Sequence, residues 1–255
     1  MNRYLHRVPL GVPIMIGVWF LATRGSWSSP LVLPRPELVF GSLLSQLSTQ
    51  SLWQDTLMTT FRALSGLALS AFLGIPIGLV LGQLAGLYRH VAFVLDFVRS
   101  IPSATLFPLF ILAFGIGELA KVAVVFYGCF FIVVMAAVYG GRSNSDRNKR
   151  IATLRSLRAR RSQIFVLVVF PDAMANILGG LRIAASIALV LVVVTEMFLG
   201  ANDGLGKRIY DFYLAYRIPE LYAALLILGV LGYVANRGIE QLEGVYKLRL
   251  AGGSR

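Results

Sequence analysis

The sequence predicts an all-α membrane protein, a polytopic bundle of about six transmembrane helices with one short cytoplasmic helix. Hydrophobic residues make up 57% of the 255-residue chain and charged residues only 14%, whereas a soluble domain carries about 25% charged residues. This composition excludes a soluble enzyme, a disordered chain and a collagen-like fibre. Apolar stretches of the length that crosses a bilayer, roughly 20 residues, are predicted near residues 8–23, 60–84, 91–114, 119–140, 174–199 and 219–236.

The first predicted span is short and contains two prolines, and we interpret it as a membrane anchor. The stretch from Glu37 to Leu57 is weakly amphipathic, so we expect it to lie along the outer interface. The last span is short but unbroken from Leu221 to Val234. Because no soluble linker or second domain is visible, residues 1–255 are predicted to form a single transmembrane domain.

Basic residues predict the orientation of the bundle. Six spans place both termini on one side, and the segments on that side hold 15 Lys and Arg residues against 5 on the other. Cytoplasmic loops collect such residues, so both termini are predicted to be cytoplasmic. Most of the net charge of +12 is therefore a topology signal, and nucleic-acid binding is not predicted.

Small residues recur at every fourth position of the second span. Such a stripe allows helix backbones to approach closely in lipid. It either packs inside the bundle, which is the interpretation we favour, or forms a sliding or subunit-facing surface. The stripe consists of Gly66, Ser70, Gly74, Gly78 and Gly82.

Ionisable residues inside the spans are candidates for a substrate pathway. Asp96 and Arg99 share a helix face in the third span. They form a structural ion pair near the inner interface, or Arg99 belongs to a kinked polar segment that lines the pathway. Thr195 and Glu196, near the outer end of the fifth span, are either gate residues or a cap at the water boundary. The kinked segment continues with Pro102, Ser103 and Thr105.

The loop over residues 141–171 is the most basic part of the chain. Eight Lys or Arg residues and one Asp lie between Arg142 and Arg161. Ile151, Leu154 and Leu157 recur every three residues and predict a short amphipathic helix. Such a helix either binds anionic lipid headgroups or docks onto a soluble partner. The arginines around it are Arg155, Arg158, Arg160 and Arg161.

The sequence predicts no catalytic chemistry of its own. Cys129 and two scattered histidines indicate neither a disulfide framework nor a metal site. Residues 201–208 resemble a phosphate-binding loop only superficially, because the first glycine is missing and Arg208 replaces the final Ser or Thr. Any ATP hydrolysis is therefore expected on a partner.

Four stretches resemble one known family. The segment Arg99–Val122 is similar to the third-span signature of bacterial ABC importer permeases, especially the branch that handles nitrate, sulfonates, taurine and bicarbonate. Leu33–Val39, Leu178–Met197 and Asn202–Gly206 agree with the same family. These stretches are distributed over residues 31–240.

The resemblance implies a permease subunit that forms the pathway of a small solute through the bacterial inner membrane by alternating access. Arg99 and the family branch suggest an anion. The implied partners are ABC ATP-binding subunits that carry ATP and Mg²⁺, a second permease subunit, identical or different, and a substrate-binding protein or lipoprotein. Residues 150–162 would couple the chain to the ATPase. The candidate coupling residues are Ile151, Ala152, Leu154, Arg155, Leu157, Arg158, Arg160 and Arg161.

The coupling loop departs from the family's Glu-Ala-Ala pattern. Ala152 stands at the Glu position and Arg158 at the glycine position. That glycine usually permits a left-handed turn, which costs other residues about 1–2 kcal/mol. Either the turn is rebuilt or the loop docks differently, so we hypothesise a heteromeric permease or a specialised ATPase. The alternatives are a non-transporting scaffold that keeps the fold and, with less support, a stand-alone secondary transporter.

Overall fold

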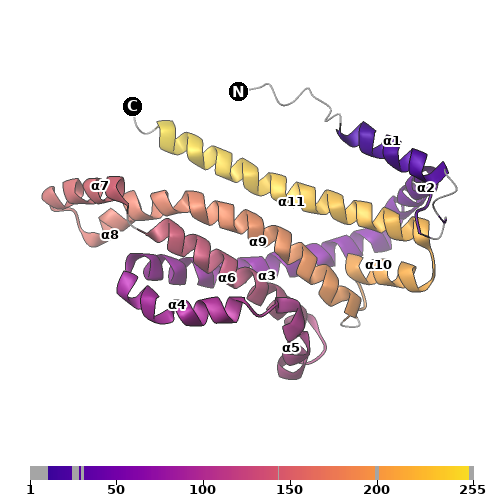
Figure 1. Ribbon diagram of the computed structural model, residues 1–255, viewed down its shortest axis with the longest axis horizontal. Coiled ribbons are helices and arrows are strands. Elements are labelled where there is room, and N and C mark those ends of the chain that lie inside the picture. Colours follow the sequence, from indigo (N-terminus) through magenta and orange to yellow (C-terminus); the bar gives the residue numbers. More distant parts are fainter. Residues whose placement is uncertain (1–10, 25–28, 30–31, 143, 199–200, 253–255) are drawn as a thin grey trace.

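The computed structural model describes the backbone of residues 11–24, 29, 32–142, 144–198 and 201–252, and the regular elements in these ranges are all helices. The long helices run along one axis (Figure 1). The short helices α7 (Ser145–Ser156) and α8 (Arg161–Ile164) lie at one end of that axis. The opposite end carries α2 (Pro36–Leu47) and α10 (Leu205–Leu214).

Four helical segments are long and apolar enough to cross a membrane, and a bent pair makes a possible fifth. The predicted count of six is therefore not confirmed for the described residues. The first predicted span corresponds to α1 (Gly11–Arg24), which has only 14 residues and buries none of them, while residues 8–10 lie outside the described ranges. The four long segments are Gln50–Gln83, Glu118–Gly141, Arg161–Phe198 and Ile218–Tyr246.

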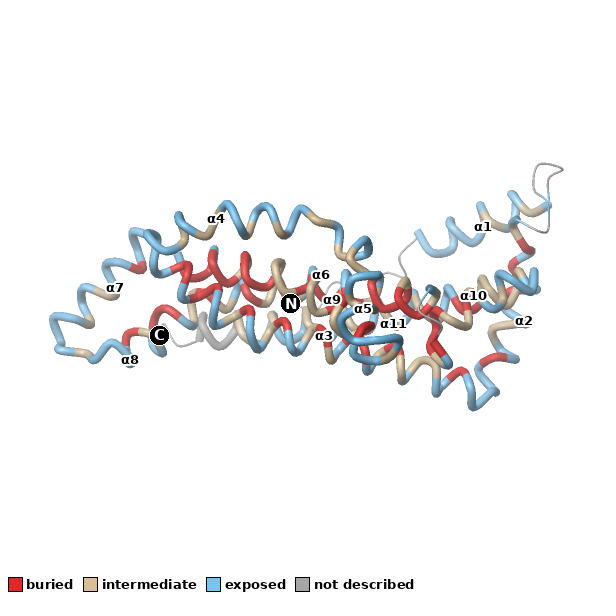
Figure 2. Tube along the Cα trace, turned by 90° about the horizontal axis from the view of Figure 1, so that it is seen from below, coloured by how far each residue is buried: buried red, intermediate tan, exposed pale blue. Residues whose placement is uncertain are grey.

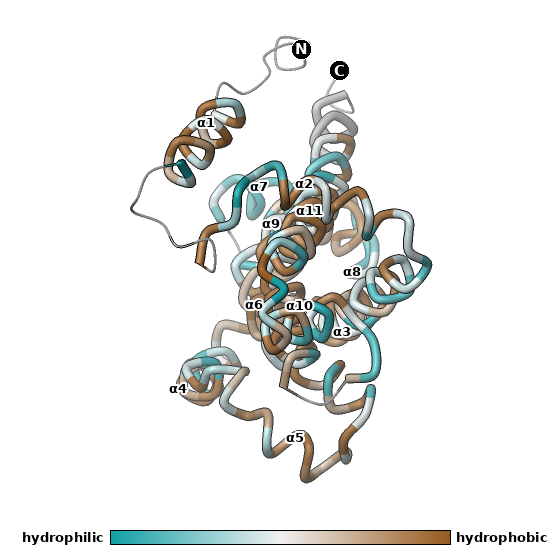
Figure 3. Tube along the Cα trace, turned by 90° about the vertical axis from the view of Figure 1, so that its right-hand side faces the viewer, coloured by the Kyte–Doolittle hydropathy of each residue, from teal (hydrophilic) through white to brown (hydrophobic). Residues whose placement is uncertain are grey.

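The predicted third span over 91–114, expected to be kinked, is bent sharply in the structure. The chain forms α4 (Ala85–Arg99), then a 3₁₀ turn η1 (Ser103–Leu106) and α5 (Phe107–Phe114), with a 76° bend. Pro102 lies at the break, where its missing N–H and its ring prevent the helix from continuing. Figure 3 shows α5 turned away from α4 and strongly hydrophobic.

The stretch over 37–57, predicted to lie along the outer interface, belongs to two helices. It divides into α2 and the first turns of α3 (Gln50–Gln83), which begins ten residues before the predicted second span. Trp53 Nε1 donates a hydrogen bond back to the carbonyl of Leu47 across the break. α2 packs instead against the start of α11 (Ile218–Gly252), where Gln46 Nε2 donates to the carbonyl of Glu220 at 3.1 Å.

Pro171 does not interrupt the helix that leads into the fifth span. The helix continues from α8 through a π-helical segment η2 (Phe165–Val169) into α9 (Phe170–Phe198). In η2 the N–H of Phe170 bonds to the carbonyl of Phe165, five residues earlier. This wide turn lets the proline stand in the first turn of α9, where the loss of its N–H is tolerated.

The core lies between α3, α6 (Glu118–Gly141) and α9, where the buried residues gather in Figure 2. The five small residues of the α3 stripe all lie against α6. A Cβ atom on Gly66 would come within 2.5 Å of Val125 Cγ1, and one on Gly78 would overlap the carbonyl oxygen of Val134. Ser70 Oγ donates to the carbonyl of Phe126 at 2.9 Å. Small residues thus bring the two backbones together.

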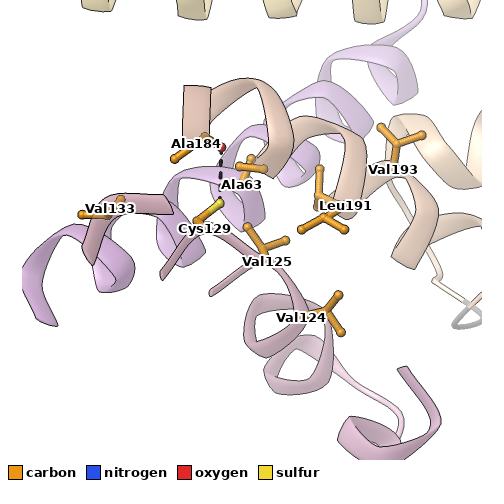
Figure 4. Close-up of a cluster of buried hydrophobic side chains, with 10 residues drawn as sticks. Ala63, Val124, Val125, Cys129, Val133, Ala184, Leu191 and Val193 are labelled. Carbon is orange, nitrogen blue, oxygen red and sulfur yellow. Dashed lines mark hydrogen bonds between the residues drawn. The ribbon is translucent and has the colours of Figure 1, made fainter. Parts of the chain in front are cut away.

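The same core extends across α6 to α9 (Figure 4). Cys129 Sγ lies 3.3 Å from the carbonyl of Ala184, and Leu191 packs beside Val125. Many large apolar side chains on the outer faces of the helices remain exposed, for example Leu112 at 84% and Phe72 at 76%. Such faces suit a lipid environment, in which apolar surface needs no protein cover.

Candidate functional site

A cavity of about 730 Å³ opens between the end of α4, α6 and α9. Three of the predicted pathway residues, Arg99, Pro102 and Ser103, line it. The bend between α4 and α5 places these three residues at the cavity, because the chain turns away from the axis of α4 at the point where α4 faces α6. Thr105 lies instead beside a smaller cavity of about 370 Å³, next to Pro108.

Arg99 is the single charged residue among the described residues that line the larger cavity. Its Nε donates to Asp96 Oδ1 at 2.9 Å, and both side chains are half exposed. The ion pair predicted between Asp96 and Arg99 therefore forms, and Arg99 also borders the cavity. Ser103, Tyr127, Tyr139 and Asn176 add uncharged polar groups to the lining, and the other side chains are apolar.

Two neighbouring glycines of α9 shape the cavity differently. A Cβ on Gly180 would collide with the side chain of Ala136 on α6, so this glycine sets the distance between the two helices. A Cβ on Gly179 would meet nothing within 4 Å. The cavity therefore has room for a side chain at position 179, and helix packing does not demand a glycine there.

Thr195 and Glu196 do not line this cavity. Glu196 is 1% exposed and lies in an ionic cluster, the Arg62 junction, which we define as Arg62, Glu118, Glu196 and Asp203; Arg62 and Glu196 are buried, and the other two are partly exposed. Arg62 Nη1 donates to Glu196 Oε1 at 2.7 Å, while its other nitrogens bind Glu118 at 2.6 and 2.8 Å and Asp203 at 2.5 Å. One guanidinium thus joins α3, α6, α9 and the loop after α9.

The loop over 201–206 is held to α3 by further hydrogen bonds. The N–H of Gly204 donates to Asp55 Oδ1 at 2.8 Å, and the N–H of Leu205 donates to Thr59 Oγ1 at 2.8 Å. Glu196 also accepts from the Thr59 hydroxyl and from the N–H of Gly206 at 2.9 Å. A buried carboxylate with this many donors is satisfied, so in this structure the junction fixes the helices and the loop to one another.

Sequence reasoning missed Arg62 as a site residue. A signal for it existed, because Arg62 lies four positions before Gly66 and thus continues the small-residue stripe toward the end of the helix. A cation on the packed face of a transmembrane helix needs an anionic partner. Glu118, at the start of α6, and Glu196 provide carboxylates for Arg62. They are too far from Arg62 in the sequence for any spacing rule to predict the pairing.

At the other end of the bundle, Arg147 fastens α7 to the core. The side chain is buried and donates to Asp172 Oδ2 at 3.0 Å, to the carbonyl of Gly140 at 2.8 Å and to that of Arg142 at 2.7 Å. Asn144 caps α7 by accepting from the N–H of Arg147. α7 is therefore connected both to the end of α6 and to the start of α9.

The left-handed turn after α7 is present although its glycine is missing. Arg158 has φ +57°, its N–H bonds to the carbonyl of Arg155 at 2.9 Å, and the N–H of Ala159 bonds to that of Leu154 at 3.0 Å. This pair of bonds is the Schellman motif that ends many helices. Of the two alternatives left open by the sequence, the structure shows a turn retained at the energetic cost of a non-glycine residue.

The remaining candidate residues of this loop divide by exposure. Ile151 and Leu154 are half buried toward the core, as the amphipathic pattern predicts, but Leu157 is 73% exposed. The pattern fails at Leu157 because the helix ends at Ser156 and the chain turns outward. The fully exposed candidates are Ala152, Arg155, Arg158, Arg160 and Arg161.

No cluster of three or more His, Cys, Asp or Glu residues suited to a metal ion occurs in the described part of the chain. The sequence matches, over residues 74–243, the family described as the inner membrane component of binding-protein-dependent transport systems. The chain belongs to this family. It is thus a permease of the ABC importer type, a membrane component of a transporter and not its catalytic subunit.

Three curated relatives illustrate the range of the family. The permease is 31% identical to SsuC of Escherichia coli, a protein named for aliphatic sulfonate transport, over 96% of this chain and 93% of that one. It is 27% identical to the taurine transport permease TauC of the same organism, over 90% and 84%. It is 30% identical to the formylaminopyrimidine transport permease ThiX of Halalkalibacterium halodurans, over 91% of each.

Among solved structures, the permease is similar to a chain of the MetNI methionine ABC transporter in an inward-facing conformation. The TM-score is 0.59 with 19% sequence identity, covering 86% of this chain and 99% of that chain. This likeness shows the fold alone.

Proposed function

We propose that the permease forms part of the membrane pathway for a small organic anion of the sulfonate class. The observation that carries this proposal is the cavity between α4, α6 and α9, whose one charged lining residue is the cation Arg99. A guanidinium binds a sulfonate through two parallel N–H donors, as it binds carboxylate and phosphate. The apolar remainder of the lining suits the alkyl part of such a molecule.

The geometry of Arg99 supports this use. Only its Nε is engaged by Asp96, and within the described residues its two terminal nitrogens donate no hydrogen bond. The Asp96 carboxylate reduces the local charge, which favours a site that binds an anion weakly enough to release it. The names of SsuC and TauC agree with this substrate class, whereas that of ThiX does not require a charged substrate.

The basic α7 end is proposed to face the cytoplasm, because Lys and Arg residues gather on the side that remains inside. ATP-binding subunits, with ATP and Mg²⁺ bound to them, would dock there. A substrate-binding protein or lipoprotein would deliver the solute at the α10 end, and a second permease subunit, identical or different, would complete the pathway.

Movement of α7 would reach the cavity by a short route. Arg147 on α7 binds Asp172 on α9 and the last carbonyls of α6. These two helices carry most of the cavity wall. A displacement of α7 by an ATP-driven partner would therefore move both walls, as alternating access requires.

The proposal is tested by uptake into proteoliposomes that contain the complete transporter. We expect Arg99→Ala to reduce the uptake of a radiolabelled alkanesulfonate by at least about tenfold, and Arg99→Lys to reduce it less, because charge is kept while the fork geometry is lost. Arg89→Ala, which removes an exposed cation from the same helix outside the cavity, is the matched control. Equal uptake by Arg99→Ala and the control would contradict the proposal.

A further inference from the structure

Four arginines at the α7 end carry positive charge without a compensating carboxylate. We call Arg155, Arg158, Arg160 and Arg161 the basic tip; all four are exposed. No acidic side chain in the described ranges lies within ion-pair distance of any of them. Arg147 and Arg150, by contrast, share Asp172.

The basic tip is held in a defined shape. The Schellman turn at Arg158 closes the end of α7, and the N–H of Arg160 donates to Gln163 Oε1 at 2.7 Å to open α8. Arg147 fixes the base of the hairpin to the core. Leu157, which directly precedes Arg158 in the chain, is 73% exposed. Because the backbone that carries the charges is already ordered, binding a partner costs little backbone entropy.

The position of the tip favours a protein partner over lipid. α7 and α8 lie at the far end of the long axis along which the spanning helices run (Figure 1). The tip therefore projects away from the bilayer and not along its surface. At its base, a pocket of about 350 Å³ is lined by Arg155, Gln83 and Asn148 together with Ile151. This pocket has room for one acidic side chain beside a guanidinium.

We propose that the ATP-binding subunit meets this tip with an acidic groove, and that charge complementarity selects the partner. The inference rests on the proposed function, in which α7 docks onto that subunit. Carboxylates of the groove would face the four arginines as charge-assisted pairs, and an apolar spot at its centre would receive Leu157. An ATP-binding subunit whose groove fits the family's usual Glu-Ala-Ala loop would leave these four charges unpaired. Such a subunit would bind this permease weakly.

The test measures the affinity of the full-length permease, in nanodiscs, for the ATP-binding subunit of its own transporter. We expect the triple variant R155E/R158E/R160E to lower this affinity at least roughly 100-fold. The triple variant R155K/R158K/R160K keeps the charge and should stay within about threefold of the native chain. R89E, an exposed charge reversal at the start of α4, is the control for nonspecific electrostatics.

Salt provides a second readout that a merely misfolded variant would not give. Raising NaCl from low to high concentration should weaken binding of the native chain, because screening reduces attraction. The same change should strengthen any residual binding of the triple Glu variant, because screening reduces repulsion. Unchanged thermal unfolding of the isolated variant would show that its fold is intact.

The possible failures are distinguishable. If the native permease does not bind the ATP-binding subunit at all, the proposed function falls together with this inference. If the native chain and the triple Glu variant bind equally well, only the acidic groove is refuted. The triple Glu variant could also lose binding only in nanodiscs that contain phosphatidylglycerol and not in nanodiscs of phosphatidylcholine. That result would show that the tip binds lipid, and it would refute the acidic groove as well.

Discussion

The guanidinium of Arg62 lies 2.7 Å from the carboxylate of Glu196, and each side chain is at most 1% exposed. The two residues are 134 positions apart and join α3 to α9. Burying two charges costs several kcal/mol per ion unless further hydrogen bonds satisfy them. Here Glu118, Asp203 and Thr59 provide those bonds, so the pair specifies how three spanning helices meet the loop beyond α9.

Arg62→Met should destabilise the permease strongly, because it leaves the buried Glu196 carboxylate without its cation. Breaking a buried pair in this way costs about 3–5 kcal/mol. Thermal unfolding of the detergent-solubilised protein would measure the loss. The double variant Arg62→Met with Glu196→Met removes both charges and should recover part of the stability.

The matched control for that experiment is Arg217→Gln. Arg217 also forms an ion pair, with Glu220 at 2.8 Å, but its side chain is 57% exposed. Exposed pairs contribute only about 0–1 kcal/mol. If both single variants lowered the unfolding temperature equally, burial would not be what makes the Arg62 junction important.

Gly78→Ala should destabilise the contact between α3 and α6. The new methyl group would overlap the carbonyl oxygen of Val134, a backbone atom that cannot move alone. Overpacking of this kind costs about 1–3 kcal/mol. Gly229→Ala, where a Cβ meets nothing within 4 Å on α11, should be neutral or slightly stabilising in the same unfolding assay. A neutral Gly78→Ala would mean that the two helices have room to separate.

Arg158→Gly should stabilise the isolated permease and weaken its binding to the ATP-binding subunit. Glycine removes the strain of φ +57°, a gain of about 0.5–1 kcal/mol, but it also removes one charge of the basic tip. Tyr216→Gly is the control, because Tyr216 has φ +53° in a second turn of the same kind after α10. Tyr216→Gly should stabilise the protein equally and leave binding of the ATP-binding subunit unchanged. If Tyr216→Gly also weakened this binding, the loss in Arg158→Gly could not be assigned to the missing charge.

Gly179→Leu should block transport while preserving the fold. The position lines the cavity and has free space around its Cα, so the leucine side chain would occupy the proposed pathway without steric conflict. Helix propensity would favour the change by up to about 1 kcal/mol. We expect uptake to fall at least about tenfold with no loss of thermal stability. Native uptake by this variant would place the pathway elsewhere.

The sequence predicted the class of the fold and several of its close contacts. Composition and apolar runs located four long helices, and the stripe from Gly66 to Gly82 marked the face of α3 that packs on α6. It predicted a kink near Pro102 but not a bend as large as 76°, because a proline in a spanning helix either kinks it or ends it, depending on its neighbours. The boundary between α2 and α3 was missed for a similar reason, since both flanks have moderate apolar character.

The candidate site was only partly accessible from residues alone. Arg99, Pro102 and Ser103, predicted as pathway residues, line one cavity because they are close together in the chain. The role of Glu196 stayed open, and its partner Arg62 was overlooked. An ion pair across 134 residues leaves no local spacing to detect.

The sequence determined the local properties of the chain, because each depends on neighbours along one helix. These properties are its hydrophobicity, its small-residue stripe and the excess of arginines near α7. The tertiary structure alone decided which charges became buried partners, where the cavity opened, and that Arg158 adopts the turn usually made by glycine. These outcomes depend on distances between helices far apart in the chain, or on a balance of strain against hydrogen bonds. Packing of the whole bundle sets both.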